Sequence, residues 1–305
     1  NTILSGGVSS GLFRTTNGGD SWVKVSPNDD IHNVTALAQD PRTGFQNIWY
    51  YATGERVGNS ASLGSAYRGR GIWKSIDNGV TWSQIAITNS PQETFQAIDY
   101  IMALEVSPIN GDLMIAGYRR IYRYDGDDLN IELENESGGR LMTDLVINSS
   151  GRVFAAFEGN ASTQEGVWTS PTGNGEWTRI AQNGDPENWN ATGRIVLSNA
   201  PSNDNVIYAL YQNGKDNEEG ELEADLWKYD LSTDTWTNYS DKLPDEEGGD
   251  LAGNDPFSIQ GGYDLVVSVK PDDENFVTIN FSGSNFIKPQ KNSATKVLTT
   301  TYLPN

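Results

Sequence analysis

The sequence has 305 residues, of which 36% are hydrophobic and 10% aromatic, so the chain can bury a sizeable core. Asp and Glu number 41 against 21 Lys and Arg, and the resulting net charge of −20 repels nucleic acids and anionic membrane surfaces. The chain has no cysteine, which excludes disulfides, zinc–thiolate sites and thiol nucleophiles.

Residues 1–26 are predicted to form three short strands, at 2–4, 11–15 and 22–25. The turn between the second and third strands carries small polar residues, a glycine and an aromatic residue at fixed spacing: Thr15, Asn17, Gly19, Ser21 and Trp22. Because these strands correspond to the last three of a four-stranded unit, we expect that the chain starts in the middle of a repeat and that the natural protein continues upstream.

A complete four-stranded unit follows at 34–86, with strands at 34–41 and 48–54 and a hairpin at 71–85. The hairpin turn repeats the earlier pattern with Ser75, Asp77, Gly79, Thr81 and Trp82. Asp77 can accept hydrogen bonds from backbone amides of the turn, and Gly79 can adopt a positive φ without steric cost. We therefore expect a structural role for Asp77 and not a catalytic one.

A Gly- and Ser-rich insertion, residues 55–70, separates the second and third strands of this unit. Loops of this length in a compact repeat are commonly functional. Its charged and aromatic residues suit a polar ligand such as a glycan or a peptide, and two arginines from the next unit can join them. The predicted ligand-binding residues are Glu55, Arg56, Tyr67, Arg68, Arg119 and Arg120, with Arg70 beside them. Alternatively, Arg68 and Arg70 pair with nearby acids and only order the loop.

Further units are predicted at 101–135, 141–181 and 193–240, with a partial unit at 263–287. Weaker copies of the hairpin pattern lie at 166–177 and 226–236. We expect Trp22, Trp82, Trp177 and Trp236 to pack between neighbouring sheets. Residues 288–305 lack the pattern; they form an atypical tail, or they return to supply the strand missing from the first unit.

Four-stranded units repeated in this way predict an all-β fold, a β-propeller with about six blades or part-blades in residues 1–287. The Ser-x-Asp-x-Gly-x-Thr-Trp phrase at 75–82 resembles the BNR or Asp-box repeat of sialidases, sortilin-type domains and several glycoside hydrolase propellers. The longer run from Trp49 to Trp82 resembles secreted BNR-like repeat proteins common in Bacteroidetes. The resemblance implies a secreted or cell-surface propeller, and it implies no particular activity.

The residues favour a binding or adhesion module that recognises a glycan or peptide, with a glycoside hydrolase as the alternative. A sialidase would need a cluster of three arginines, and it is not expected, because basic residues are few and the Arg-Ile-Pro motif of that family is missing. A hydrolase would need two carboxylates flanking a glycosidic bond. The candidates are Glu55, Asp99 and Asp144, and the competing interpretation is that each is a solvated acid at the end of a strand.

None of these interpretations requires a cofactor, although Asp125, Asp127 and Asp128, or residues 245–255, could bind calcium. The single histidine, His32, lies between predicted units and is expected at the surface. A Ser/His/Asp triad is not expected, because no nucleophile elbow accompanies this histidine. We expect a monomer that binds a glycan or protein ligand, with no nucleic acid partner and no membrane insertion.

Overall fold

The computed structural model describes most of the chain. The described residues are 2–7, 9–28, 32–56, 66–89, 96–136, 141–159, 163–216, 222–243, 265–281 and 299–302. Strands dominate these ranges, and the helical segments are three single 3₁₀ turns: η1 (Ala86–Thr88), η2 (Ala97–Asp99) and η3 (Ser240–Lys242). No helix within these ranges is long and apolar enough to cross a membrane.

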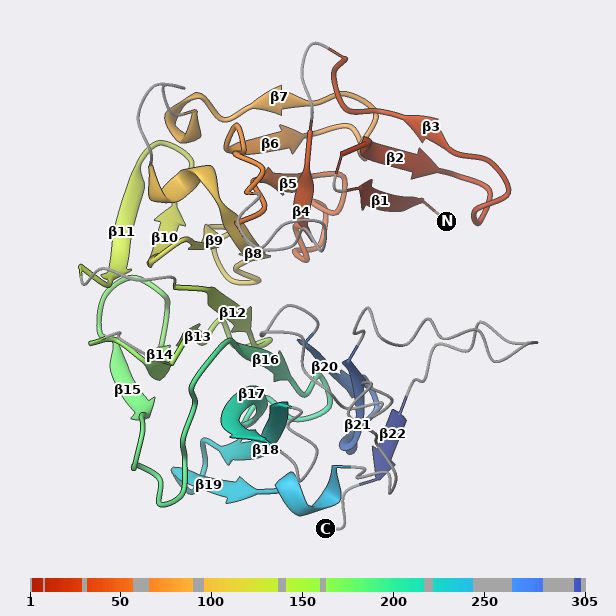
Figure 1. Cartoon of the computed structure of the whole chain (residues 1–305). Helices are drawn as coiled ribbons and strands as arrows, with labels where there is room; N and C mark the ends of the chain where they lie inside the picture. Colours follow the sequence, from red (N-terminus) through yellow and green to blue (C-terminus); the bar gives the residue numbers. More distant parts are fainter. Residues whose placement is uncertain are drawn as a thin grey trace. The chain divides into compact units, whose positions relative to one another are not determined.

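The described strands form six sheets, and each sheet is built from strands that follow one another along the chain (Figure 1). The first three sheets contain β1 (Ile3–Gly7), β2 (Gly11–Thr15), β3 (Val23–Lys24); β4 (Val34–Gln39), β5 (Trp49–Thr53), β6 (Ile72–Ser75), β7 (Ser83–Gln84); β8 (Ile101–Val106), β9 (Leu113–Gly117), β10 (Arg120–Tyr124), β11 (Leu129–Glu134). The last three contain β12 (Thr143–Ile147), β13 (Val153–Phe157), β14 (Gly166–Ser170), β15 (Thr178–Ala181); β16 (Ile195–Asn199), β17 (Val206–Asp216), β18 (Leu222–Asp230), β19 (Thr235–Asn238); β20 (Leu265–Lys270), β21 (Asp273–Phe281), β22 (Thr299–Tyr302). Four sheets therefore have four strands and two have three, as expected for six blades or part-blades.

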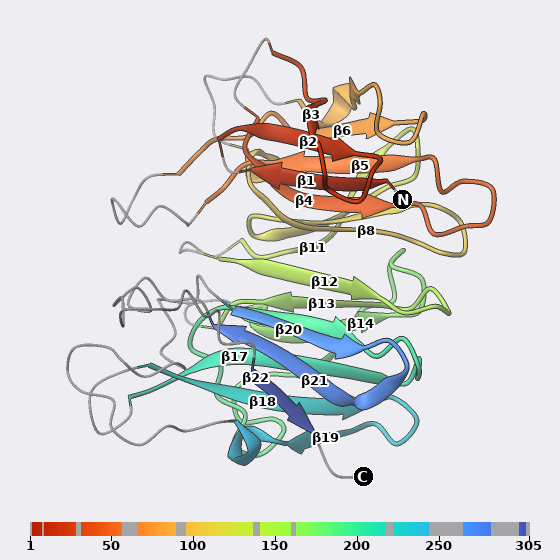
Figure 2. The same ribbon diagram turned by 90° about the vertical axis from the view of Figure 1, so that its right-hand side faces the viewer.

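Short connections and antiparallel pairing explain why each sheet forms locally. In Figure 2 the longest pair, β17 and β18, runs side by side, in register from Val206 opposite Asp230 to Gln212 opposite Ala224. The middle strands β9 and β13 are buried at every position. By contrast, β20 alternates strictly between buried and exposed residues, so one face of this strand meets solvent.

The chain divides into two compact units. Unit 1 comprises Asn1–Glu136 with Ser170–Glu176, and unit 2 comprises Ser137–Thr169 with Trp177–Asn305. In unit 1, one apolar cluster joins the sheet of β4–β7 to that of β8–β11 through residues such as Ile72, Ile101 and Ile115. In unit 2, Phe154, Trp189 and Tyr211 belong to a cluster that joins the sheets of β12–β15 and β16–β19. Consecutive sheets therefore pack face to face within each unit, as propeller blades do.

The turn between β6 and β7 is closed by side chains. Asp77 Oδ1 accepts hydrogen bonds from the backbone N–H groups of Val80 and Thr81, at 3.1 and 2.9 Å, and from the Ser75 hydroxyl at 2.7 Å. The Thr81 hydroxyl donates to Asp77 Oδ2 at 2.5 Å. These bonds, led by that of the Thr81 hydroxyl, lower the pKa of Asp77 to about 2. Asp77 therefore has a structural role in this hairpin.

The turn between β2 and β3 has the same geometry with an amide in place of the carboxylate. Asn17 Oδ1 accepts from the Thr15 hydroxyl at 2.7 Å and from the Ser21 N–H at 3.1 Å. Gly19 adopts a φ of 103°, and its N–H donates to the Thr15 hydroxyl. Trp22, however, is 41% exposed, so it does not pack between sheets as predicted.

The packing predicted for Trp82 and Trp236 agrees with the structure. Trp82 packs in the cluster between the first two sheets, with its ring 4.8 Å from that of Tyr51. In unit 2, Trp236 Nε1 donates to the Ile180 carbonyl in the preceding sheet at 2.7 Å. Both indoles therefore join neighbouring blades.

The end of the chain needs one correction. Within the predicted tail, Thr299–Tyr302 forms β22 and pairs with β21, from Ile279 opposite Thr299 to Phe276 opposite Tyr302. Three consecutive threonines and a tyrosine have high strand propensity, and the open edge of β21 offers them a partner. The described part of the tail therefore extends the sixth sheet and does not complete the first one.

Candidate functional site

Several strand ends of unit 1 lie together. β5, which ends at Thr53, pairs with β6, which begins at Ile72, and the Gly54 carbonyl accepts from the N–H of Ile101 at the start of β8. We call the surrounding residues, 32–33, 54–56, 66–71, 97–100 and 118–119, the loop end of unit 1. This end contains both described ends of the insertion.

Gly54 allows the second and third blades to approach closely at the loop end. It adopts a φ of 106°, and a Cβ atom at this position would lie 1.9 Å from the carbonyl oxygen of Asp99. The Asp99 carbonyl also accepts a hydrogen bond from the Gly69 N–H at 2.9 Å. Only glycine fits a backbone approach of this kind, so the position of the insertion is set by main-chain contacts.

The insertion is closed at its base by the pair Glu55 and Tyr67. Their backbones exchange two hydrogen bonds, of 2.9 Å from Glu55 N–H and 2.8 Å from Tyr67 N–H. The Asn33 side-chain amide donates to the Tyr67 carbonyl at 2.7 Å. Residues 57–65 lie outside the described part of the chain. The two predicted binding residues are therefore neighbours, and the Tyr67 side chain is 38% exposed.

Arg68 and Asp99 form an ion pair at the loop end. Arg68 Nε lies 2.9 Å from Asp99 Oδ2, and the side chain of Asp99 is 1% exposed. The same carboxylate oxygen accepts the N–H of Gln96 at 2.8 Å. Asp99, a predicted catalytic candidate, thus anchors the insertion to the turn η2 that precedes β8.

Arg56 lies over two tyrosine rings at the loop end. Its guanidinium carbon is 5.1 Å from the ring centroid of Tyr118 and 5.7 Å from that of Tyr100. Arg119 lies 5.1 Å from the Tyr118 ring on the turn between β9 and β10, with a φ of 67°. Both tyrosines are buried. Cation–π attraction holds Arg56 over both rings and Arg119 over the ring of Tyr118.

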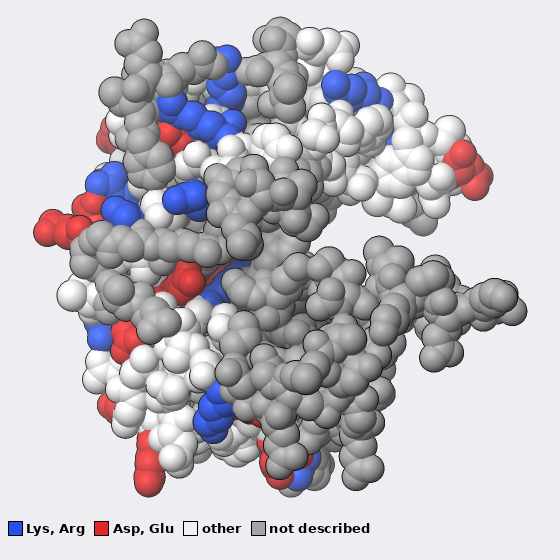
Figure 3. Space-filling model, viewed as in Figure 1, with Lys and Arg blue, Asp and Glu red and all other residues white. Residues whose placement is uncertain are grey.

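The sequence interpretation missed Tyr100 and Tyr118. Tyr100 directly precedes β8, and Tyr118 directly follows β9. An aromatic residue next to a strand end was the signal by which the sequence could have identified them. Arg120, in contrast, was predicted as a ligand contact but forms an ion pair with Glu134, its cross-strand neighbour. Figure 3 shows basic side chains gathered on unit 1 over β8 and β10, with acidic side chains close by.

The third catalytic candidate, Asp144, lies in unit 2. Asp144 Oδ2 accepts the backbone N–H of Leu197 at 2.8 Å, so it links β12 to β16. Burial raises the pKa of Asp144 to about 6, although the charge of Arg194 and the hydrogen bond from Leu197 act in the opposite direction. A carboxyl group with such a pKa can hold a proton near neutral pH.

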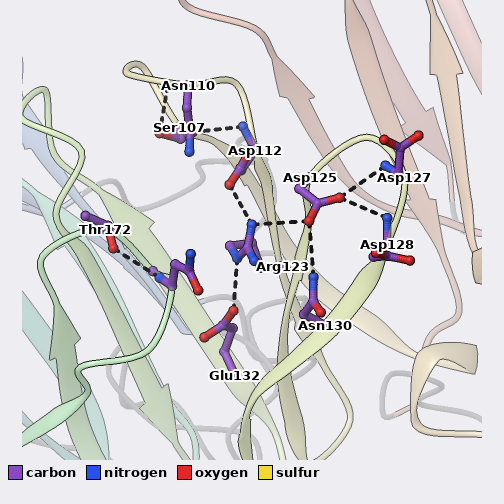
Figure 4. A network of polar contacts seen from close by, with 12 residues as sticks. Ser107, Asn110, Asp112, Arg123, Asp125, Asp127, Asp128, Asn130, Glu132 and Thr172 are labelled. Atoms are coloured by element: carbon purple, nitrogen blue, oxygen red, sulfur yellow. Dashed lines mark hydrogen bonds and ion pairs between the residues drawn. The ribbon is translucent and has the colours of Figure 1, made fainter.

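The acidic loop at 125–128 is organised by internal bonds (Figure 4). Asp125 Oδ1 accepts the N–H groups of Asp127 and Asp128 at 3.1 and 2.9 Å, and its Oδ2 lies 3.6 Å from Arg123 Nη1. Nowhere in the described ranges do three His, Asp or Glu side chains converge as a metal ion requires. The other predicted calcium loop, 245–255, lies outside these ranges.

His32 is a correction to the sequence interpretation, because it is 2% exposed and not a surface residue. Its Nδ1 lies 3.0 Å from the Tyr51 hydroxyl, and its ring meets the Trp73 ring edge-on at 4.9 Å. Two aromatic residues from the second sheet therefore cover a residue that local sequence placed in a linking loop.

The chain matches no family model. It is 26% identical over 240 residues to a xyloglucanase from a Paenibacillus species, which corresponds to 75% of this chain and 18% of that protein. Among solved structures, an ancestral GH74 enzyme superposes with a TM-score of 0.61 and 17% identity, covering 93% of this chain and 33% of that one. The GH74 xyloglucanase from Xanthomonas campestris gives a TM-score of 0.59 and 16% identity, covering 92% and 40%.

This chain therefore spans less than half the length of these relatives. The solved structures are β-propeller enzymes, and their likeness extends over both units of the chain. With six sheets of three or four strands in its described residues, the chain has an all-β propeller fold.

Proposed function

We propose that this chain is the propeller part of a glycoside hydrolase-type protein, and that the loop end of unit 1 binds a polysaccharide of the xyloglucan class. The observation that carries the proposal is the position of Arg56 over Tyr100 and Tyr118, next to the closed base of the insertion. The similarity to a xyloglucanase supplies the ligand class.

The loop end has the chemistry that sugar binding requires. Tyr67 offers a partly exposed aromatic ring. Glu55, which pairs with Tyr67 at the base of the insertion, and the adjacent Arg56 are half-buried polar residues. Aromatic faces pack against the C–H groups of pyranose rings, while charged and polar groups hydrogen-bond to hydroxyls. A net charge of −20 disfavours anionic polysaccharides and favours a neutral one.

Calorimetric titration with xyloglucan oligosaccharides tests this proposal. We expect Arg56→Ala and Tyr67→Ala each to weaken binding at least about tenfold, which corresponds to about 1.4 kcal/mol. Arg179→Ala is the matched control, because Arg179 lies over Trp168 in unit 2 in the same manner, 4.7 Å from the ring. Unchanged affinity in both loop-end variants would refute a binding site at this position.

A second candidate function is hydrolysis by this chain itself. It is favoured by the xyloglucanase similarity and by the raised pKa of Asp144, which suits a general acid. Release of reducing ends from xyloglucan by the purified chain, lost in Asp144→Asn, would support it. Asp99 is a weaker candidate, because its carboxylate is already bound by Arg68 and by the Gln96 N–H.

Four expectations from the sequence belong to the same proposal. The hairpins at Asp77 and Asn17 act as Asp-box turns, supported by their side-chain hydrogen bonds. Secretion or surface location fits a polysaccharide ligand, and the chain acts as a monomer without a required cofactor. Repeating the titration with calcium and with a chelator, and measuring mass by light scattering, tests the last two statements.

A further inference from the structure

A polar pocket lies at the opposite end of β5 from the loop end, with a volume of about 430 Å³. It is lined by residues from the chain start, the β4–β5 connection and the β6–β7 turn: Thr2, Gln39, Gln46, Asn47, Trp49 and Asn78. Trp49 begins β5 and Thr53 ends it, so four residue steps of about 3.3 Å place the two sites about 13 Å apart along this strand.

Among the described residues, the lining carries no ionisable side chain, in a protein with 62 acidic and basic residues (41 Asp and Glu plus 21 Lys and Arg). Four of its six side chains are carboxamides, and the others are a hydroxyl and an indole. An anionic ligand would find no cationic side chain among these six described residues, and a hydrocarbon would leave the amides without partners. The lining therefore selects a neutral ligand that both donates and accepts hydrogen bonds.

Three of the four side-chain amides are each held in place by a hydrogen bond that uses one of their two polar atoms. Gln39 Nε2 donates to the Gln46 carbonyl at 2.6 Å, Gln46 Oε1 accepts the Gly44 N–H at 3.0 Å, and Asn47 Nδ2 donates to the Ile76 carbonyl at 2.5 Å. Within the described ranges no bond occupies Gln39 Oε1, Gln46 Nε2 or Asn47 Oδ1. Two acceptors and one donor are thus oriented in advance, which lowers the entropy lost on binding.

The indole of Trp49 is fixed in a similar way. Its Nε1 donates to Asn78 Oδ1 at 3.3 Å, and Asn78 Nδ2 donates to the Thr2 hydroxyl at 3.1 Å. Asn78 itself is held at a φ of 62° by a hydrogen bond from its N–H to the Asn47 carbonyl, at 2.9 Å. Trp49 is only half-buried, so part of its apolar ring lines the pocket.

We propose that this pocket is a second carbohydrate site, which binds one neutral pyranose unit through Trp49 and the amides of Gln39, Gln46 and Asn47. The C–H face of the sugar packs on the indole, and its hydroxyls donate to the two free acceptors and accept from Gln46 Nε2. The inference rests on the pocket's own chemistry and does not require that the loop end binds a polysaccharide.

Saturation-transfer NMR with D-xylose, D-glucose and D-galactose tests this site, with D-glucuronate as the anionic comparison. We expect saturable binding of at least one neutral sugar and at least about tenfold weaker binding of glucuronate. Gln39→Ala and Gln46→Ala should each weaken binding of the neutral sugar about fivefold, which corresponds to one hydrogen bond of about 1 kcal/mol. Gln182→Ala, at an exposed glutamine of unit 2, should leave binding of the neutral sugar unchanged.

Two further comparisons keep this test independent of the loop end. Arg56→Ala should leave monosaccharide binding at this pocket unchanged, and Gln46→Ala should leave loop-end oligosaccharide binding unchanged. The far-ultraviolet circular dichroism of each variant checks that the fold is retained. Absence of saturable binding by all three neutral sugars, equal binding of glucuronate, or full binding by Gln46→Ala would each overturn the proposal.

Discussion

Arg68 and Asp99 are joined by an ion pair in which Nε lies 2.9 Å from Oδ2, although 31 positions separate them in the chain (99 − 68). Asp99 is buried, and Arg68 is partly exposed at 29%. The pair connects the insertion that follows β5 with the turn that leads into β8. The loop end of unit 1 therefore depends on a contact between consecutive blades.

Replacing Asp99 by Asn should destabilise the protein by about 2 kcal/mol, because it leaves Arg68 without its buried counter-charge. The loss is smaller than for a fully buried pair, since water reaches the arginine. Urea unfolding followed by tryptophan fluorescence measures it. If Asp99→Asn abolished hydrolysis of xyloglucan without lowering stability, Asp99 would be catalytic and not an anchor.

Removal of the Asp77 side chain should loosen the β6–β7 hairpin. Asp77→Ala loses the carboxylate that binds two backbone N–H groups and two hydroxyls, and we expect a loss of about 1 kcal/mol after discounting for solvent. Asp77→Asn should lose less, because Asn17 makes equivalent bonds in the first hairpin.

The pH dependence of the same variant gives a separate check. The pKa of Asp77 is lowered from 3.8 to about 2, so its stabilising effect is complete above the unfolded value and is lost as the pH falls towards 2. The stability difference between the wild type and Asp77→Asn should therefore shrink below about pH 4. A difference that stays constant down to pH 2 would contradict this.

Asp144 should have the opposite pH dependence. Its pKa is raised from 3.8 to about 6, so the folded state holds the proton more tightly and stability falls as the pH rises from about 4 through 6. Asp144→Asn removes this titration, and the wild type should lose on the order of 2 kcal/mol relative to it across that window. Parallel stability profiles for the two proteins would show that Asp144 is not perturbed in this way.

Arg123 neutralises a cluster of carboxylates in unit 1 (Figure 4). It lies 2.9 Å from Asp112, 3.0 Å from Glu132 and 3.6 Å from Asp125, and its own side chain is 11% exposed. Arg123→Met should cost about 3 kcal/mol, because partly buried carboxylates lose their cation. Lys242→Met, which removes an exposed pair with Asp241, is the control and should change stability by less than about 0.5 kcal/mol.

The sequence was sufficient for features set by local chemistry. The hairpin at Asp77 and the strands around it follow from turn residues and alternation within about fifteen positions, and the structure confirms them. The blade order follows in the same way, because neighbouring strands pair in sequence order. The position of the insertion between β5 and β6 also led to Glu55 and Tyr67, which the structure brings together.

Features that depend on distant contacts could not be predicted. His32 is buried by Tyr51 and Trp73, whose positions follow from the pairing of β5 and β6 and not from the residues around His32. The contact of Arg56 with two tyrosine rings likewise arises only when β8 and β9 bring Tyr100 and Tyr118 beside the insertion. The Tyr118 N–H donates a hydrogen bond to the Tyr100 carbonyl at 2.9 Å.

Hydrogen–deuterium exchange mass spectrometry, with and without saturating xyloglucan oligosaccharide, tests the central claim most directly. Binding at the loop end predicts slower exchange in peptides that cover residues 66–70, 97–101 and 117–120, because their amides lie beside Arg56 and Tyr67. Peptides of unit 2 should exchange as before. Protection confined to unit 2, or no protection at any of these three segments under saturation, would contradict a polysaccharide site at the loop end of unit 1.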